Sequence, residues 1–298
     1  MKRNMKQWLE ELKTSSMKKA FPILFFPVTQ LMNKTVKELI SSSENLAEGM
    51  KLVADRVDSA AAISLMDLSV EAECFGSQVV FSESEVPTIK GSIIKEMKEV
   101  EALQIPMVGT GRTGIYIDAV RKASERILDR PVFAGMIGPY SLAGRLLDVT
   151  EIIYFCYDEP EMVTLLLEKV TEFLISYGKA YKEVGAHGIM IAEPLAGMLS
   201  PTMEAEFSAP FVKKIVEALQ DENFLVIYHN CGDNTIPMID SILTIGADAY
   251  HFGNVISMEA VSLFQRRSTT VISRWISMTC ALYACIFSTI SSTLSSTR

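Results

Sequence analysis

The sequence predicts an α/β fold in which short parallel β-strands alternate with helices. Short, almost continuously apolar segments recur along the chain, each flanked by Gly, Pro or a charged residue. Such segments are typical of parallel strands that are covered on both faces. Longer segments with apolar residues three or four positions apart separate them, which is the period of an amphipathic helix. With 49% apolar residues among 298, the chain suits one large domain or two small ones, with enough apolar material for a core.

Six segments have the length and composition of a buried strand. They are, in chain order, Phe21–Pro27, Ala61–Asp67, Pro131–Ile137, His187–Ile191, Phe224–His229 and Ala247–His251. We expect all six to lie parallel and side by side around one barrel axis. A further short strand pair is expected around Val79–Ile89, as an insertion into the repeat.

Helices are expected between these strands. The clearest is Pro160–Val184, which carries its apolar residues on one face and follows Asp158, a candidate N-cap. Three further segments show the same apolar period, namely Thr35–Ala54, Pro210–Leu219 and Ile236–Leu243. The pattern therefore contains about six βα units.

The formal net charge of −8 argues against nucleic-acid binding, which needs an excess of Lys and Arg. No acidic or basic run stands out, so the charge distribution does not indicate a particular class of binding partner. Glu10 and Glu11 stand where a signal peptide would become apolar. The 5 scattered cysteines, without a secretion signal, predict free thiols and a reducing, cytoplasmic location. We also expect no membrane partner.

Residues 265–298 differ abruptly in composition from the rest of the chain. This segment has no Asp, Glu, Gly, Pro, Asn or Lys, whereas all 36 acidic residues precede it. Its apolar run, Trp275–Ile290, is shorter than the roughly 20 residues of a membrane span. We weigh a membrane anchor, a divergent or disordered tail and a reading-frame shift, and favour the last. The expected organisation is a barrel domain over 1–264 and an atypical Ser/Thr-rich tail over 265–298.

The most specific local motif is Tyr228-His229-Asn230-Cys231-Gly232-Asp233, at the end of a predicted strand. Because side chains two residues apart on a strand point to the same side, His229 and Cys231 can face a single ion. Imidazole and thiolate are ligands that suit zinc. Two ligands are fewer than the three of a catalytic zinc site, so the alternative is a core cysteine beside a polar histidine.

Several stretches resemble the uroporphyrinogen decarboxylase superfamily, and within it the methylcobamide:coenzyme M methyltransferase-like branch. They are Met66–Glu73 with Phe75-Gly76, Gly138–Gly144, Ala192-Glu193-Pro194 with Leu199-Ser200-Pro201, and His229–Gly232. Each is weak alone, but their order and spacing from Pro22 to Asn254 are specific together. The resemblance implies a (β/α)8 TIM-type barrel, here incomplete, with an aberrant C-terminal tail.

The resemblance also implies a chemistry. In that branch the His-x-Cys pair binds zinc with another cysteine from late in the barrel, so His229 and Cys231 are the expected metal ligands. The zinc activates a thiol acceptor as thiolate, which takes a methyl group from the methyl-corrinoid of a partner corrinoid protein. The thiolate, not the thiol, attacks in such a displacement, and zinc both lowers the thiol pKa and orients the sulfur.

The same motifs supply further candidate site residues. Glu193 follows the fourth predicted strand, at the face where barrel active sites lie, as a fourth zinc ligand, a base or a solvated loop acid. Asp67 ends the second strand as a catalytic or substrate-binding acid, or as a helix N-terminal acid stabilised by the dipole. Glu71, Gly138 and Tyr140 are candidate contacts of the corrinoid cofactor.

Other polar residues have simpler interpretations. His251 ends the sixth strand at the same mouth and is a reserve ligand, whereas His187 opens a strand at the opposite end and is interpreted as structural. The stretch Gly109–Gly114 is rich in glycine, yet no phosphate-binding motif surrounds it, so we expect a flexible loop.

Two alternatives to the methyltransferase stay open. One is a uroporphyrinogen decarboxylase-type enzyme of tetrapyrrole (haem) biosynthesis, which uses no metal and holds its substrate with an Arg-rich N-terminal segment and an aspartate. Here Val28–Met32 contains no arginine. The other is a catalytically dead binding fragment, because six βα units do not close an eight-stranded barrel. Cys280 and Cys285 lie in the tail, in surroundings unlike a strand end, and are not expected to complete a zinc site.

Overall fold

The structure, a computed structural model, describes residues 3–17, 19–253 and 256–257. Its centre is a curled five-stranded sheet in which every pair of neighbours is parallel, in the order β1-β4-β5-β6-β7. The strands are β1 (Ala62–Ile63), β4 (Val132–Ile137), β5 (Gly188–Ala192), β6 (Leu225–Asn230) and β7 (Ala249–Phe252). The architecture is the α/β half-barrel that the sequence predicts, an incomplete (β/α)8 TIM-type barrel.

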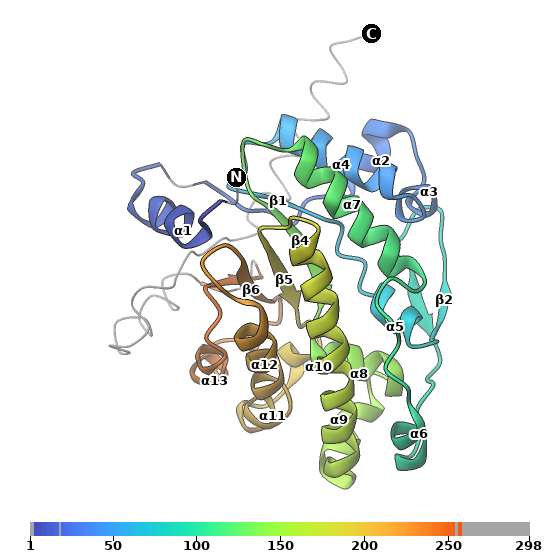
Figure 1. Cartoon of the computed structure of the whole chain (residues 1–298). Helices are drawn as coiled ribbons and strands as arrows, with labels where there is room; N and C mark the ends of the chain where they lie inside the picture. Colours follow the sequence, from blue (N-terminus) through green and yellow to red (C-terminus); the bar gives the residue numbers. More distant parts are fainter. Residues whose placement is uncertain (1–2, 18, 254–255, 258–298) are drawn as a thin grey trace.

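Helices surround this sheet, and α7, α10 and α12 lie side by side over its outer face in Figure 1. The helices before β4 are α1 (Met5–Thr14), α2 (Pro27–Met32), α3 (Val36–Ile40), α4 (Ser43–Arg56), α5 (Val70–Cys74), α6 (Met97–Ala102) and α7 (Arg112–Arg126). The later ones are α8 (Pro139–Leu147), α9 (Glu151–Asp158), α10 (Pro160–Glu183), α11 (Pro201–Phe207), α12 (Ala209–Leu219) and α13 (Ile239–Thr244), with a 3-10 turn at Ala196–Met198. The predicted inserted pair is confirmed as antiparallel β2 (Gln78–Val80) and β3 (Thr88–Lys90).

Strands β4 to β7 confirm four of the predicted strands within two residues at each end. Their side chains alternate between two cores. On β6, Leu225 and Ile227 pack inside the barrel, whereas Val226 and Tyr228 pack under the helices. Both faces are therefore buried, which explains why these strands are apolar without a gap.

The prediction of a strand at Phe21–Pro27 is wrong. Residues 21–25 form no ladder with the sheet, and Pro27 is the first residue of α2. Pro22 has no N–H to donate to a neighbouring strand, and Pro27 favours the first turn of a helix, so prolines bound the segment at both sides. Phe21 and Phe25 are nevertheless buried, which accounts for the apolar pattern.

Two other predicted elements are shorter or divided. β1 covers only Ala62–Ile63 of the expected Ala61–Asp67, because the hydroxyl of Ser64 accepts the Gly135 N–H (2.8 Å) in place of a ladder bond. The expected helix over Thr35–Ala54 is two helices, α3 and α4.

Serine explains the division between α3 and α4. Ser42 caps α4 by accepting the N–H of Asn45, and serine favours such caps over helix interiors. Asp158 is likewise no N-cap, since it is the last residue of α9 and Glu159 precedes α10.

Helix α1 closes the N-terminal end of the barrel interior. Met5 and Leu9 are buried there, and Lys6 forms an ion pair with Asp248 before β7. The interior residues that share this core are Phe21, Phe133, Met190, Leu225 and Ile227. Helix α1 thus covers the half-barrel at the end opposite the carboxyl termini of the strands.

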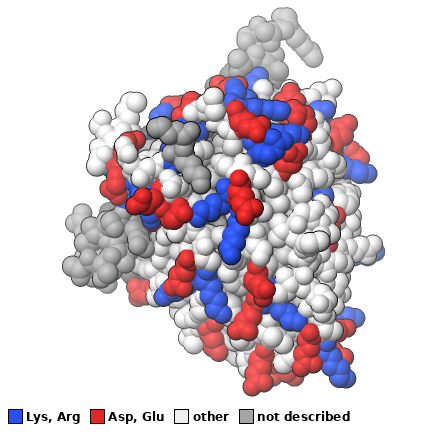
Figure 2. All heavy atoms as spheres, viewed as in Figure 1, with Lys and Arg blue, Asp and Glu red and all other residues white. Residues whose placement is uncertain are grey.

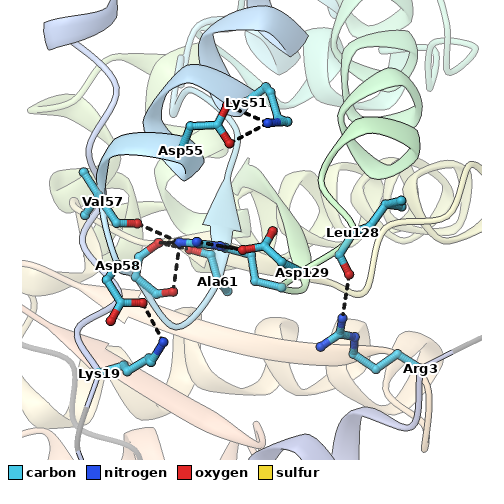
Figure 3. A network of polar contacts seen from close by, with 11 residues as sticks. Arg3, Lys19, Lys51, Asp55, Val57, Asp58, Ala61, Leu128 and Asp129 are labelled. Atoms are coloured by element: carbon cyan, nitrogen blue, oxygen red, sulfur yellow. Dashed lines mark hydrogen bonds and ion pairs between the residues drawn. The ribbon is translucent and has the colours of Figure 1, made fainter.

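Polar contacts hold the loops at this same end together (Figure 3). Arg3 donates to the carbonyl of Leu128 (3.3 Å), and Arg130 donates to the carbonyl of Val57 (2.7 Å) while pairing with Asp129 (2.8 Å). These bonds join the chain before α1 to the loops that precede β1 and β4. They are structural contacts at the stability face of a barrel.

Acidic and basic side chains are interspersed on the face shown in Figure 2. The described part of the chain has no helix that combines the length and the hydropathy of a membrane span. The predicted tail over 265–298, with Trp275–Ile290, lies outside the described residues.

We predict that Leu9→Ala lowers the free energy of unfolding by about 2–5 kcal/mol, because the variant leaves a cavity where α1 meets the barrel interior. Urea unfolding monitored by circular dichroism measures this value. Met17→Ala is the control, since Met17 is 72% exposed, and it should change stability by less than about 0.5 kcal/mol. Equal effects of the two variants would contradict the role of α1.

Candidate functional site at the carboxyl ends of the strands

The register of the sheet aligns one residue of each long strand in a row. Ile137 pairs with Ala192, Ala192 with His229, and His229 with His251. The row lies at the carboxyl ends of β4 to β7, where the loops of a parallel sheet meet. This is the end at which barrel enzymes carry their sites.

His229 and His251 lie next to each other in this row, and both point to the barrel interior, as Ile227 and Ala249 do two residues earlier. Their ring centroids are 4.8 Å apart and their Nδ1 atoms 2.9 Å apart. Nδ1 of His229 is also 3.0 Å from the carbonyl oxygen of His251, and Nε2 of His251 is 3.2 Å from the carbonyl oxygen of Phe21. Both nitrogens of His251 are engaged, so it is not available as the reserve ligand that the sequence suggested.

Burial makes this pair neutral. It lowers the pKa of His229 to about 4, against the hydrogen bond with the backbone of His251, which raises it. Burial also lowers the pKa of His251 to about 3, and the neighbouring His229 lowers it further. At neutral pH each ring therefore carries one proton, on one nitrogen.

Cys231 follows directly after β6 and is exposed. The backbone around Cys231 is packed tightly. A Cβ added at Gly232 would lie 2.6 Å from the Cα of Gly197, in the loop that follows β5. In the described residues, no three His, Cys, Asp or Glu side chains gather closely enough to hold a metal ion. The described site thus offers an imidazole and a thiol, and not a complete set of ligands.

Glu193 directly follows β5. Its side chain lies on the helix side of the sheet, under the start of α8, whereas His229 faces the barrel interior. The Glu193 side chain is buried and accepts the N–H of Tyr140 (2.9 Å), the N–H of Ser141 (2.9 Å) and the hydroxyl of Ser141 (2.6 Å). A carboxylate is stabilised at a helix N-terminus by the free N–H groups and the dipole. These are the contacts of a capping group; a catalytic role for Glu193 stays a prediction.

Gly138 and Tyr140, the expected cofactor contacts, belong to the same arrangement. A Cβ at Gly138 would overlap the carboxyl group of Glu193, so only glycine leaves room for this acid. Tyr140 is fully buried, and its hydroxyl lies 3.9 Å from the sulfur of Cys156. Neither residue presents a polar side chain to the mouth.

Asp67 is held by Arg112, which lies in the stretch predicted to be a flexible loop. Arg112 is the first residue of α7, is 7% exposed and pairs with both Asp67 and Glu73. Asp67 also accepts the N–H (3.0 Å) and hydroxyl (2.6 Å) of Ser69, and the hydroxyl of Tyr116 (3.3 Å). The expected loop is therefore an ordered helix start, and the only hint in the sequence was an arginine among glycines.

Glu71 and Glu204 are two further buried acids, and the sequence motifs indicate only Glu71. Burial raises the pKa of Glu71 to about 7, although one oxygen accepts the N–H of Ile137 (3.1 Å). The other oxygen of Glu71 has no hydrogen-bond partner in the described chain, and the same holds for both oxygens of Glu204 on α11. Burial likewise raises the pKa of Glu204 to about 7. Glu71 is 2% exposed, and its role as a cofactor contact stays a prediction.

A cavity of about 480 Å³ opens at the opposite end of the barrel. Its charged lining residues are engaged with the protein: Lys182 donates to the carbonyl of Leu219 (2.7 Å) and pairs with Asp221 (2.8 Å). His187 also lines it and accepts the N–H of Val132 at Nδ1 (3.1 Å), as expected of a structural histidine. We therefore place the functional site at the carboxyl ends of the strands.

Known proteins are similar to most of this chain. Residues 15–273 match the family described as uroporphyrinogen decarboxylase (URO-D). The methylcobamide:CoM methyltransferase MtbA of Methanosarcina acetivorans is 29% identical over 175 residues, 57% of this chain and 51% of that protein. A uroporphyrinogen decarboxylase of a Geobacter species is 27% identical over 221 residues, 72% of this chain and 63% of that protein. The chain thus spans about half of the first relative and under two-thirds of the second.

A solved structure shares the fold. A methyltransferase from Methanosarcina mazei superposes with a TM-score of 0.78 at 20% sequence identity, covering 89% of this chain and 80% of that chain. This likeness supports the incomplete barrel described above.

We predict that Glu193→Gln lowers the free energy of unfolding by about 1–3 kcal/mol, because an amide nitrogen cannot accept the N–H and hydroxyl groups at the start of α8. Glu151→Gln is the matched control, since Glu151 is an exposed acid in the first turn of α9. Its loss should cost at most about 1 kcal/mol. Urea unfolding compares the two, and a Glu193→Gln variant as stable as the parent chain would contradict the capping role.

We predict that the contribution of Glu204 to stability falls as pH rises from about 4.5 to about 7, and that Glu204→Gln removes this contribution. The pKa of Glu204 is about 7 in the folded chain against 4.5 as its ordinary value. Within that window the folded chain keeps a proton that the unfolded chain releases, so the raised pKa favours the folded state less and less.

Urea unfolding at a series of pH values measures the slope. Between pH 4.5 and 7, Glu204→Gln should make the slope of stability against pH more positive, by at most about 1.4 kcal/mol per pH unit. Exposed Glu206→Gln, on the same helix, should leave it unchanged. Identical slopes in the parent chain and Glu204→Gln would contradict the raised pKa.

Proposed function

The chain belongs to the uroporphyrinogen decarboxylase (URO-D) family, and we propose that it is a zinc-dependent methyltransferase of that family. In this proposal it moves a methyl group from a methyl-corrinoid protein to a thiol or similar acceptor. The observation that carries the proposal is the pair of donors at the end of β6. His229 faces the barrel interior with Nδ1 hydrogen-bonded, and Cys231 offers an exposed thiol two residues later.

The donor chemistry supports zinc. Imidazole nitrogen and thiolate are the ligand types that zinc prefers. A ligating histidine normally donates its other ring N–H to a carbonyl, as Nδ1 of His229 can to the carbonyl of His251. We propose that His229 and Cys231 hold zinc together with a donor that the described residues do not supply. Cys280 and Cys285 lie outside the described residues.

Zinc would supply two things, a lowered pKa for the acceptor thiol and a fixed position for its sulfur. The chain's own residues would place that acceptor. Gly197 and Gly232 bring two loop backbones together beside the metal ligands, and Glu193 anchors α8 next to them. The methyl donor would approach over the open carboxyl ends of the strands.

We also propose a corrinoid protein as partner and the cytoplasm as location. The names of similar proteins, methylcobamide:CoM methyltransferase and methylated-thiol–coenzyme M methyltransferase, support a corrinoid protein as methyl donor and a small thiol as acceptor. Cys74, Cys156 and Cys231 are free thiols, which supports a cytoplasmic location.

The structure weighs against a decarboxylase of tetrapyrroles. Such an enzyme needs an accessible aspartate, and the side chain of Asp67 is fully buried. Arg112 takes one of its oxygens and Ser69 the other. These contacts make Asp67 an anchor between α5 and α7, and a catalytic role for it stays a prediction.

We predict that the purified chain, after removal of metal and reloading, binds about one zinc ion. Cys231→Ser and His229→Ala should each lose it, because a hydroxyl is a far poorer zinc ligand than a thiolate and alanine has no donor. Cys74→Ser is the control and should retain zinc, since Cys74 lies on α5. Atomic emission measures the metal content.

Methyl transfer is then followed by the absorbance of methylcobalamin in the presence of 2-mercaptoethanesulfonate. Turnover that is lost together with zinc supports the proposal. A folded parent chain without zinc and without turnover would overturn it and leave the catalytically dead binding fragment as the function.

A further inference from the structure

We propose that His251 is a positioning residue. It holds His229 in the tautomer that is protonated at Nδ1, and so leaves Nε2 of His229 as the atom that binds the metal. The inference deepens the zinc site proposed above and rests on it. The tautomer itself is a property of the metal-free chain and can be tested without zinc.

The carbonyl oxygen of Phe21 lies 3.2 Å from Nε2 of His251. A carbonyl can only accept a hydrogen bond, so Nε2 of His251 carries a proton. A neutral imidazole has one N–H, and Nδ1 of His251 is therefore an acceptor.

His229 completes the chain of bonds. Its Nδ1 lies 2.9 Å from Nδ1 of His251 and 3.0 Å from the carbonyl oxygen of His251. Both neighbours are acceptors, and both need a donor. Only a proton on Nδ1 of His229 satisfies them, because an unprotonated Nδ1 would bring three lone pairs together.

This tautomer leaves the second nitrogen of His229 unprotonated. With its single proton on Nδ1, the ring has a free lone pair on Nε2, which makes no hydrogen bond within the described residues. Neutral imidazole binds zinc through such a nitrogen. His187, which accepts the Val132 N–H at Nδ1, must be protonated at Nε2 and has the opposite tautomer.

The fold makes this arrangement rigid. His229 and His251 are direct partners in the β6–β7 register, and His251 is only 1% exposed. Phe21 is fully buried in the barrel interior, where its ring packs on Phe133 at 5.4 Å between centroids. The backbone carbonyl that accepts the hydrogen bond from His251 therefore has little freedom to move.

Nitrogen-15 NMR of the metal-free chain, labelled in histidine, tests the tautomer directly. The chain has 3 histidines, so three ring systems are observed. We expect His229 to be protonated at Nδ1, and His251 and His187 at Nε2. His187 is thus an internal reference of opposite type to His229. A His229 protonated at Nε2 would overturn the inference, whether or not zinc binds.

Two variants test the positioning role. In His251→Phe the ring can neither accept from His229 nor donate to Phe21, so a population of His229 protonated at Nε2 should appear. Its affinity for Zn²⁺, measured by competition with a chromophoric chelator, should fall about 10–100-fold. His251→Gln keeps an acceptor and a donor on its amide and should recover part of that loss.

His187→Gln, at the opposite end of the barrel, is the control and should bind Zn²⁺ as the parent chain does. Unchanged Zn²⁺ affinity in folded His251→Phe would overturn the positioning role. If the parent chain shows the expected tautomers but no Zn²⁺ binding, the proposed function fails while the tautomer assignment stands. The two failures are therefore distinguishable.

Discussion

The register of the parallel sheet is the constraint on which the site depends. Pairing of Ala192 with His229 and of His229 with His251 puts residues at the carboxyl ends of β5, β6 and β7 in one row. Because side chains alternate along a strand, the row also decides which face each residue takes. A shift by one residue would turn His229 toward the helices and separate it from His251.

Buried acids organise the loops around this row. Glu193 anchors the start of α8, and Asp67 ties α5 to α7 through Arg112. Each carboxylate is matched by donors from another element, as burial of a charge requires. The family motifs around these acids thus contribute to the shape of the mouth, and a catalytic role for Glu193 or Asp67 stays a prediction beside the donors of His229 and Cys231.

The segment before α2 shows how an irregular chain can take part in a site. Prolines keep residues 21–25 out of the sheet, yet the carbonyl of Phe21 receives a hydrogen bond from His251. A regular strand would direct its carbonyl groups to a ladder partner. Here one carbonyl is turned to a side chain, and through it the protonation pattern of two histidines is set.

Local composition by itself determined the repeating βα order, the four long strands and α10, because a strand buried on both faces and an amphipathic helix each leave a period in the sequence. The pairing of His229 with Cys231 as candidate ligands was also visible, from a spacing of two. The sequence did not reveal the burial of Arg112, the role of Glu193 at α8, or the contact of His251 with Phe21. Those depend on residues far apart in the chain, and only the tertiary structure brings Phe21 within 3.2 Å of His251.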